Sequence, residues 1–148
     1  MLSNEMCGPE EELLMFINNQ YKEEGVPGYN AILWNRYYKE RPELAEDPKY
    51  KGDYIGAHID DDRGLGSRDV IAISYGDNRK FRIRDKITGN VVNEVLTRSN
   101  QIIGMHGEFQ KEFTHEIPIQ KKKIIPENPV ESDMINVRYS ATFRYHNK

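Results

Sequence analysis

The sequence predicts a mainly β (α+β) domain of jelly-roll type, with one N-terminal helix packed on a sheet. Three observations predict this fold. Helical periodicity is confined to the start of the chain, the remainder alternates short β-forming runs with turn signals, and no helical segment separates successive strands as a parallel α/β fold requires. A chain of 148 residues is expected to form one domain over residues 1–148.

The helical segment is GPEEELLMFINNQYKEEG, residues 8–25. Pro9 suits a first helical turn, the three glutamates after it oppose the helix dipole, and the final glycine is a stop signal. Leu13, Ile17 and Tyr21 follow one another at a spacing of four and form one apolar stripe. We expect this stripe to lie on the sheet.

Eight β-like runs follow, divided by turn signals such as GDN, TGN, HGE and PENP. Two charged, proline-containing segments, 39–53 and 121–133, do not read as strands and are expected to be surface loops. The expected strands are 29–38, 54–60, 70–75, 80–84, 91–96, 100–105, 113–119 and 136–144.

The composition excludes several classes of protein. Hydrophobic residues make up 37% and charged residues 30%, and no apolar run approaches the roughly 20 residues of a membrane helix. A single cysteine, Cys7, excludes an internal disulfide, and the first residues lack the basic start and apolar middle of a signal peptide. We expect an intracellular monomer, in the cytoplasm or nucleus, with no membrane partner.

A candidate metal site begins in the run YIGAHID. His58 and Asp60 are two residues apart, so on a strand they project from one face. The best-placed third ligand is His115, in EFTHEIP. Two histidines and one carboxylate on one face of iron(II) leave three coordination positions open, which suits oxygen activation. The competing interpretation is a surface acidic cluster beside an incidental histidine. His106 and His146 are expected to be structural or solvated.

A second polar group lies on the last strand. In VRYSATFR, Arg138 and Arg144 alternate with apolar residues and share a face with two hydroxyls. Guanidinium groups suit carboxylates, although a solvated strand face explains the same pattern. Asn35 and Tyr37 also share one face of a strand and can hydrogen-bond a carboxylate, or can simply border the core.

Together these segments resemble the AlkB family of iron(II)- and 2-oxoglutarate-dependent dioxygenases. The paired-arginine strand is the most specific element, and the resemblance covers the chain from about Tyr29 to Arg144. The matching strings, in family order, are YNAILWNRYY, YIGAHIDDDRGL, VIAISYGDNRKFRIR, FTHEIPIQKK and VRYSATFR.

The resemblance implies a double-stranded β-helix and a ligand set. By this resemblance His58, Asp60 and His115 look like the iron(II) ligands. The cofactors implied are iron(II), 2-oxoglutarate as co-substrate, and O2.

The resemblance also implies which residues contact 2-oxoglutarate and the substrate. Arg138 would pair with the distal carboxylate of 2-oxoglutarate, helped by Tyr37 and Asn35, and Arg144 would lie nearer the metal-bound end. Asp62 matches an acidic position that faces the substrate base in family members.

The activity implied is oxidative demethylation of alkylated nucleobases in DNA or RNA, with alkylated nucleic acid as the partner. A short N-terminal region stands where family members carry a full nucleotide-recognition lid, and net charge is −3. Two alternatives stay open: the same chemistry on a protein or small molecule, and a non-catalytic jelly-roll binding module. The sequence also contains a group of basic residues. We expect them to form a rim that faces phosphate if the substrate is nucleic acid, and a solvated surface otherwise. They are Arg79, Lys80, Arg82, Arg84 and the run QKKK (120–123).

Overall fold

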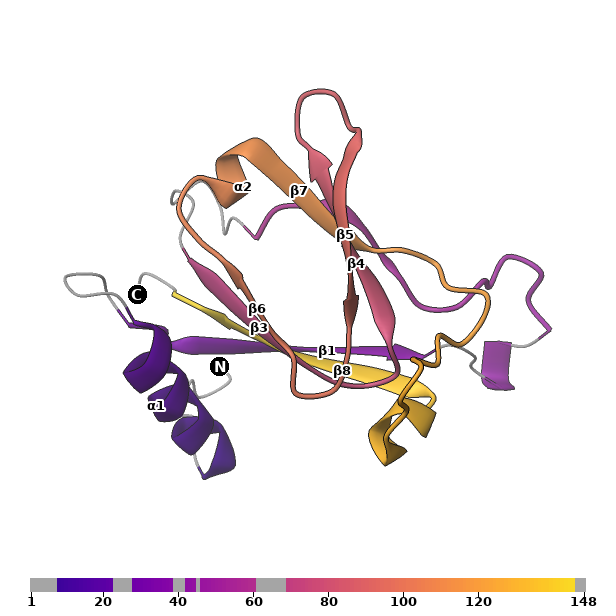
Figure 1. The fold of residues 1–148 in the computed structure, drawn as a ribbon, viewed down its shortest axis with the longest axis horizontal. Helices are drawn as coiled ribbons and strands as arrows, with labels where there is room; N and C mark the ends of the chain where they lie inside the picture. The colour runs from indigo at the N-terminus through magenta and orange to yellow at the C-terminus, as the bar shows by residue number, and fades with distance from the viewer. Residues whose placement is uncertain (1–7, 23–27, 39–41, 45, 61–68, 146–148) are drawn as a thin grey trace.

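The fold consists of two four-stranded antiparallel sheets that face each other, with one helix on the outside (Figure 1). A computed structural model describes residues 8–22, 28–38, 42–44, 46–60 and 69–145. The first sheet has the order β1-β8-β3-β6, with β1 Ala31–Tyr38, β8 Val137–Arg144, β3 Val70–Gly76 and β6 Ile102–Met105. The second has the order β2-β7-β4-β5, with β2 Ile55–His58, β7 Phe113–Ile117, β4 Arg79–Asp85 and β5 Val91–Thr97.

The connectivity is that of a jelly roll. Between consecutive strands the chain passes from one sheet to the other, except in the β4–β5 hairpin, which stays within the second sheet. Apart from β5, which pairs only with β4, each strand is therefore hydrogen-bonded to a strand distant in sequence, and the two inner faces enclose a common interior. The predicted mainly β fold, with a double-stranded β-helix, is confirmed.

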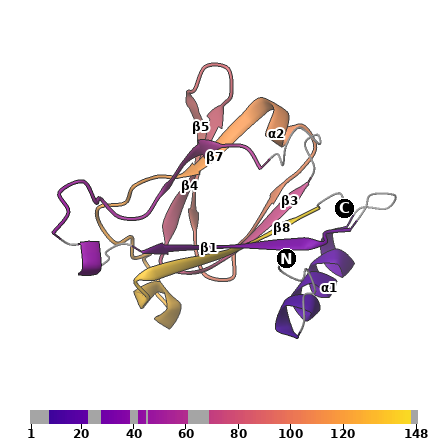
Figure 2. The same ribbon diagram turned by 180° about the vertical axis from the view of Figure 1, so that it is seen from behind.

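The N-terminal helix α1 (Pro9–Tyr21) covers the outer face of the first sheet, beside the start of β1 (Figures 1 and 2). Ile17 is fully buried there against Ile71 and Phe143, and Leu13 packs at the edge of the same cluster. The predicted stripe is confirmed for Leu13 and Ile17, but Tyr21 is 38% exposed. Apolar burial between helix and sheet therefore supplies one of the two cores.

A second core lies between the sheets, but only part of the interior is apolar. Tyr37, Val70, Phe81, Met105 and Ile117 form this inner cluster.

The outward and inward faces of β8 explain why the rest of the interior is polar. The outward side chains of Ala141 and Phe143 join the cluster under α1. The alternate residues Arg138, Ser140 and Thr142 point inward and are also buried. A strand with an apolar outer face and a buried polar inner face indicates a cavity built for a polar ligand.

The strands begin and end close to their predicted positions, with one difference that affects the site. The β2–β7 ladder ends at the pair His58–His115, so Asp60 lies beyond the strand and not on it as the alternation predicted. Helix α1 ends at Tyr21, because Lys22 is already extended. A short helix, α2 (Phe109–Glu112), and two single 3-10 turns, η1 (Pro42–Leu44) and η2 (Glu131–Met134), were not expected.

The predicted basic rim is wrong for Arg79, whereas Lys121 and Lys122 of the QKKK run are exposed. Arg79 is fully buried, and its guanidinium bonds Asp77 and the backbone oxygens of Tyr38 and Asp53. It therefore holds the chain after β1 in place instead of facing solvent.

The neighbouring cations of β4 are engaged with carboxylates. Lys80 and Arg82 pair with Glu94, while Arg82 and Arg84 pair with Glu116. These cross-strand pairs offset two of the three positive charges, which weakens the attraction of this face for phosphate. Within the described residues, no helix has the length and apolar character needed to cross a membrane.

Asp133 fastens the 121–135 segment to the barrel, and its effect on stability should depend on pH. Its carboxylate accepts hydrogen bonds from the Val130 N–H, the Asn78 amide and the Arg98 guanidinium. The Val130 bond is the main cause that lowers the pKa of Asp133, with Arg98 and Asn78 contributing and burial opposing. A depressed pKa gives stability that is present above the unfolded value of 3.8 and is lost as pH falls through the folded value.

We therefore expect Asp133→Asn to lower the free energy of unfolding at neutral pH, and the difference from the unchanged protein to shrink as the medium is acidified. Urea unfolding at several pH values from about 7 to about 3 measures this. A difference that stays constant over this range would show that the charge of Asp133 contributes nothing.

Candidate active site

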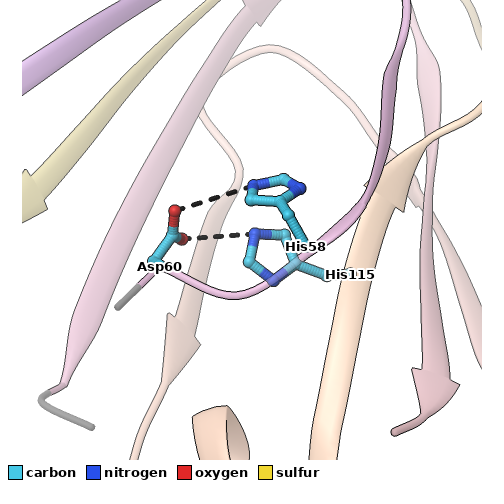
Figure 3. Close-up of side chains that lie close together, drawn as sticks. All are labelled: His58, Asp60 and His115. Carbon is cyan, nitrogen blue, oxygen red and sulfur yellow. Dashed lines mark ion pairs between the residues drawn. The ribbon is translucent and has the colours of Figure 1, made fainter. Parts of the chain in front are cut away.

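Three potential metal ligands meet at the end of the β2–β7 ladder (Figure 3). His58 and His115 are cross-strand partners, so their rings lie together with centroids 4.3 Å apart. Asp60 follows two residues later and turns its carboxylate toward both rings, at 3.7 Å from His58 Nε2 and 3.2 Å from His115 Nε2. One potential ligand atom from each residue lies within 4.8 Å of the other two.

The orientation of the His58 ring is set by a contact with the backbone. Its Nδ1 lies 2.8 Å from the carbonyl oxygen of Gly56. A carbonyl can only accept, so this nitrogen donates its proton and Nε2, the atom facing Asp60, keeps its lone pair in the neutral ring. The hydrogen bond with Asp60 raises the pKa of His58, burial opposes this, and the Gly56 bond adds to it.

Asp60 is an ionised carboxylate in a buried position. Burial by itself would raise its pKa, but hydrogen bonds with His115 and His58 and the charge of Arg144 together hold the pKa well below its usual range. Arg144 binds one carboxylate oxygen directly. Asp60 is therefore charged at neutral pH and available as an anionic ligand.

A cavity of about 170 Å³ lies between the sheets beside these ligands. All seven of the predicted metal and 2-oxoglutarate contacts line it, although they come from four strands and one loop. They are His58, Asp60, His115, Asn35, Tyr37, Arg138 and Arg144.

Arg138 is a buried cation that lacks an acidic partner. Its side chain is 3% exposed, donates to Ser74 Oγ at 2.9 Å, and lies over the ring of Tyr37 at 5.2 Å. Among the described residues no carboxylate lies within 4 Å of this guanidinium, and its Nε has no hydrogen-bond partner. Burial lowers the pKa of Arg138 to about 10, with the phenol of Tyr37 opposing, so the group stays charged at neutral pH.

Tyr37 and Asn35 complete this end of the cavity. Burial raises the pKa of the Tyr37 phenol, while Arg138 lowers it and Asp60 raises it further. The phenol therefore keeps its proton and can donate a hydrogen bond to an anion. Asn35 projects from the same face of β1 and lines the same cavity.

These observations test whether the residues fit iron(II) and 2-oxoglutarate. Two imidazoles and an ionised carboxylate are the donor set of non-haem iron sites, and they meet at one side of a polar cavity. At the other end, a buried guanidinium without an acidic partner would gain most from a ligand carboxylate. The residues therefore fit both groups.

Some predicted residues fall elsewhere. Asp62 and His146 lie outside the described residues. His106 is 43% exposed at its side chain and pairs with Asp69, as expected for a solvated histidine. Two partners were missed because nothing in the local sequence marks them: Ser74, which bonds Arg138, and Gln110, which bonds the backbone of Asp60.

Comparisons with known proteins agree with this geometry. A family model described as "2OG-Fe(II) oxygenase superfamily" matches residues 10–144. A similar solved structure, "The structure of OsALKBH1", superposes with a TM-score of 0.53 at 20% sequence identity. The alignment covers 92% of this chain and 59% of that chain, and at this identity the likeness concerns the fold. No curated protein matches the sequence.

Proposed function

This chain belongs to the 2OG-Fe(II) oxygenase superfamily, with an AlkB-like fold, and we propose that it removes alkyl groups from nucleobases in DNA or RNA by oxidation. Members of the superfamily use iron(II), 2-oxoglutarate and O2. The observation that supports the activity is one cavity with a His-Asp-His cluster at one end and, at the other, a buried arginine that has no carboxylate near it among the described residues.

We assign His58, Asp60 and His115 as the residues that hold iron(II). When bound, the metal supplies the redox chemistry that couples decarboxylation of 2-oxoglutarate to hydroxylation of a substrate C–H bond. The protein's share is positioning. The Gly56 carbonyl fixes the tautomer of His58, and Arg144 holds the Asp60 carboxylate.

Arg138 is assigned to the distal carboxylate of 2-oxoglutarate. Tyr37 would donate its hydroxyl proton to the same carboxylate, and Asn35 would add an amide hydrogen bond. Arg144 would border the metal-bound end of the co-substrate. Buried apolar walls, which include Phe81, Met105 and Ile117, would limit the water in the space between the two ends.

The choice of nucleic acid as substrate rests on the AlkB-like sequence motifs and fold. Hydroxylation of an N-methyl carbon gives an unstable product that loses formaldehyde, so formaldehyde reports the reaction. Asp62, which follows Asp60 by two residues, is assigned to face the substrate base.

We expect the protein to release formaldehyde from a methylated single-stranded oligonucleotide, in proportion to the succinate formed. Asp62→Ala should still form succinate from 2-oxoglutarate alone but release less formaldehyde. The oligonucleotide without methyl groups is the control.

Succinate formation without formaldehyde from any methylated oligonucleotide would reject the nucleic-acid substrate and leave a protein or small molecule in its place. Absence of succinate formation under all conditions would instead favour a binding module. The two outcomes are separable because succinate and formaldehyde are measured in the same reaction.

A further inference from the structure

The metal ligand Asp60 is not held by the sheet. The ladder between β2 and β7 ends at His58 and His115, so both histidines are fixed by backbone pairing whereas Asp60 lies two residues past the last pair. Arg144 holds the Asp60 carboxylate, but a ligand whose backbone is unsupported still loses conformational freedom when a metal binds, which lowers affinity. Some other contact must therefore fix the Asp60 backbone.

That contact is Gln110. Its side-chain Oε1 accepts the backbone N–H of Asp60 at 3.0 Å, across 50 residues of sequence. Gln110 is 2% exposed and is among the largest fully buried side chains. Its amide nitrogen faces Met105 Sδ at 3.8 Å, so the amide orientation with the oxygen toward Asp60 is the one that satisfies both ends.

The position of Gln110 links two ligands. Gln110 belongs to α2, which leads directly into β7. It stands five residues before His115. The same continuous segment therefore carries one histidine ligand in its strand and holds the backbone of the carboxylate ligand through its helix. The spacing between Asp60 and His115 depends on this contact and not on the sheet alone.

We propose that Gln110 is a positioning residue that preorganises the metal site by fixing the backbone of Asp60. The proposal rests on the assignment of His58, Asp60 and His115 as metal ligands. Loss of outer contacts of this kind typically weakens metal binding by about 10- to 100-fold.

The test is the affinity of the metal-free protein for Mn(II), a divalent ion that takes the same nitrogen and oxygen ligands and needs no turnover. Gln110→Met keeps the length and volume of the side chain but removes the acceptor. Gln110→Asn keeps the amide but is one methylene shorter, so its oxygen cannot reach the Asp60 N–H. Free Mn(II) is followed by electron paramagnetic resonance during titration.

Two controls separate positioning from stability. Ile17→Val removes one methyl group from the core under α1, on the far side of the first sheet, and should bind Mn(II) as the unchanged protein does. Thermal unfolding of each metal-free variant shows how far each change weakens the fold.

We expect both Gln110 variants to bind Mn(II) at least about tenfold more weakly than Ile17→Val, even where their unfolding temperatures are matched. Gln110 variants that bind as tightly as the unchanged protein would overturn the positioning role while leaving the metal site intact. If the unchanged protein and His58→Ala bind Mn(II) equally poorly, the metal assignment itself is wrong, and the proposed function fails with it.

Discussion

His58→Ala should abolish succinate formation from 2-oxoglutarate, with a loss of roughly 1,000-fold or more. A bound metal stabilises such a reaction by several kcal/mol, and each 1.4 kcal/mol corresponds to about tenfold in rate. The remaining two ligands, Asp60 and His115, cannot hold the ion at the same affinity. Succinate release with added iron(II) and ascorbate measures the effect.

The matched control is His106→Ala. Both histidines are partly exposed and each lies beside an aspartate, but the partner of His106 is Asp69, outside the cavity. The control should keep its activity. Activity that survives His58→Ala would reject the metal assignment, whereas equal losses in both variants would indicate a general effect of removing an imidazole near the surface.

Arg138→Met should raise the KM for 2-oxoglutarate by about 100-fold and yet leave the metal-free protein at least as stable as before. Truncating one partner of a buried, hydrogen-bonded charge pair costs about 2–5 kcal/mol of binding, and 1.4 kcal/mol is tenfold. Without ligand, however, the guanidinium is a buried charge with no carboxylate nearby among the described residues. Replacing it with an apolar side chain of similar length removes the free-energy cost of burying this charge.

Arg79→Met is the comparison that makes the stability result informative. Arg79 is also fully buried, but it bonds the carboxylate of Asp77 and two backbone oxygens. Breaking a buried pair costs about 3–5 kcal/mol, so this variant should unfold far more readily.

The two arginine variants are compared by urea unfolding and by the dependence of succinate formation on 2-oxoglutarate concentration. If Arg138→Met destabilised the metal-free protein as much as Arg79→Met, Arg138 would be a structural residue like Arg79. An unchanged KM in Arg138→Met would place the co-substrate carboxylate elsewhere.

Much of the fold could be predicted because jelly-roll strands carry their signals locally. On β8, alternation separates Arg138 and Thr142 from Ala141 and Phe143 without knowledge of the partners, and the structure keeps both sets apart. The predicted ends of the strands were less accurate, because a strand ends where its backbone pairing with the neighbouring strand stops. Asp60 is the clearest case: its sequence continues the alternation, but the pairing of β2 with β7 stops at His58 and His115, although β7 itself continues to Phe113.

Partners across the fold could not be predicted. Ser74 and Gln110 are ordinary polar residues in their own segments, and only the crossing of the chain between sheets brings them to Arg138 and Asp60. Arg79 was expected on a basic rim because it stands beside Lys80 and Arg82 in the sequence. Its burial follows from the Asp53 and Tyr38 carbonyls, which sequence proximity does not reveal.

The polar inner face of β8 has a consequence for the outer face of the same sheet. Because the inner face of β8 carries guanidinium and hydroxyl groups, the apolar face of this strand points outward, where Ile17 of α1 covers it. The helix carries none of the seven cavity contacts named above, but it covers the sheet that carries four of them, Asn35, Tyr37, Arg138 and Arg144. A shortened version of this protein that omits Pro9–Tyr21 would expose this apolar surface to water, and the sheet that forms one wall of the cavity would lose its outer support.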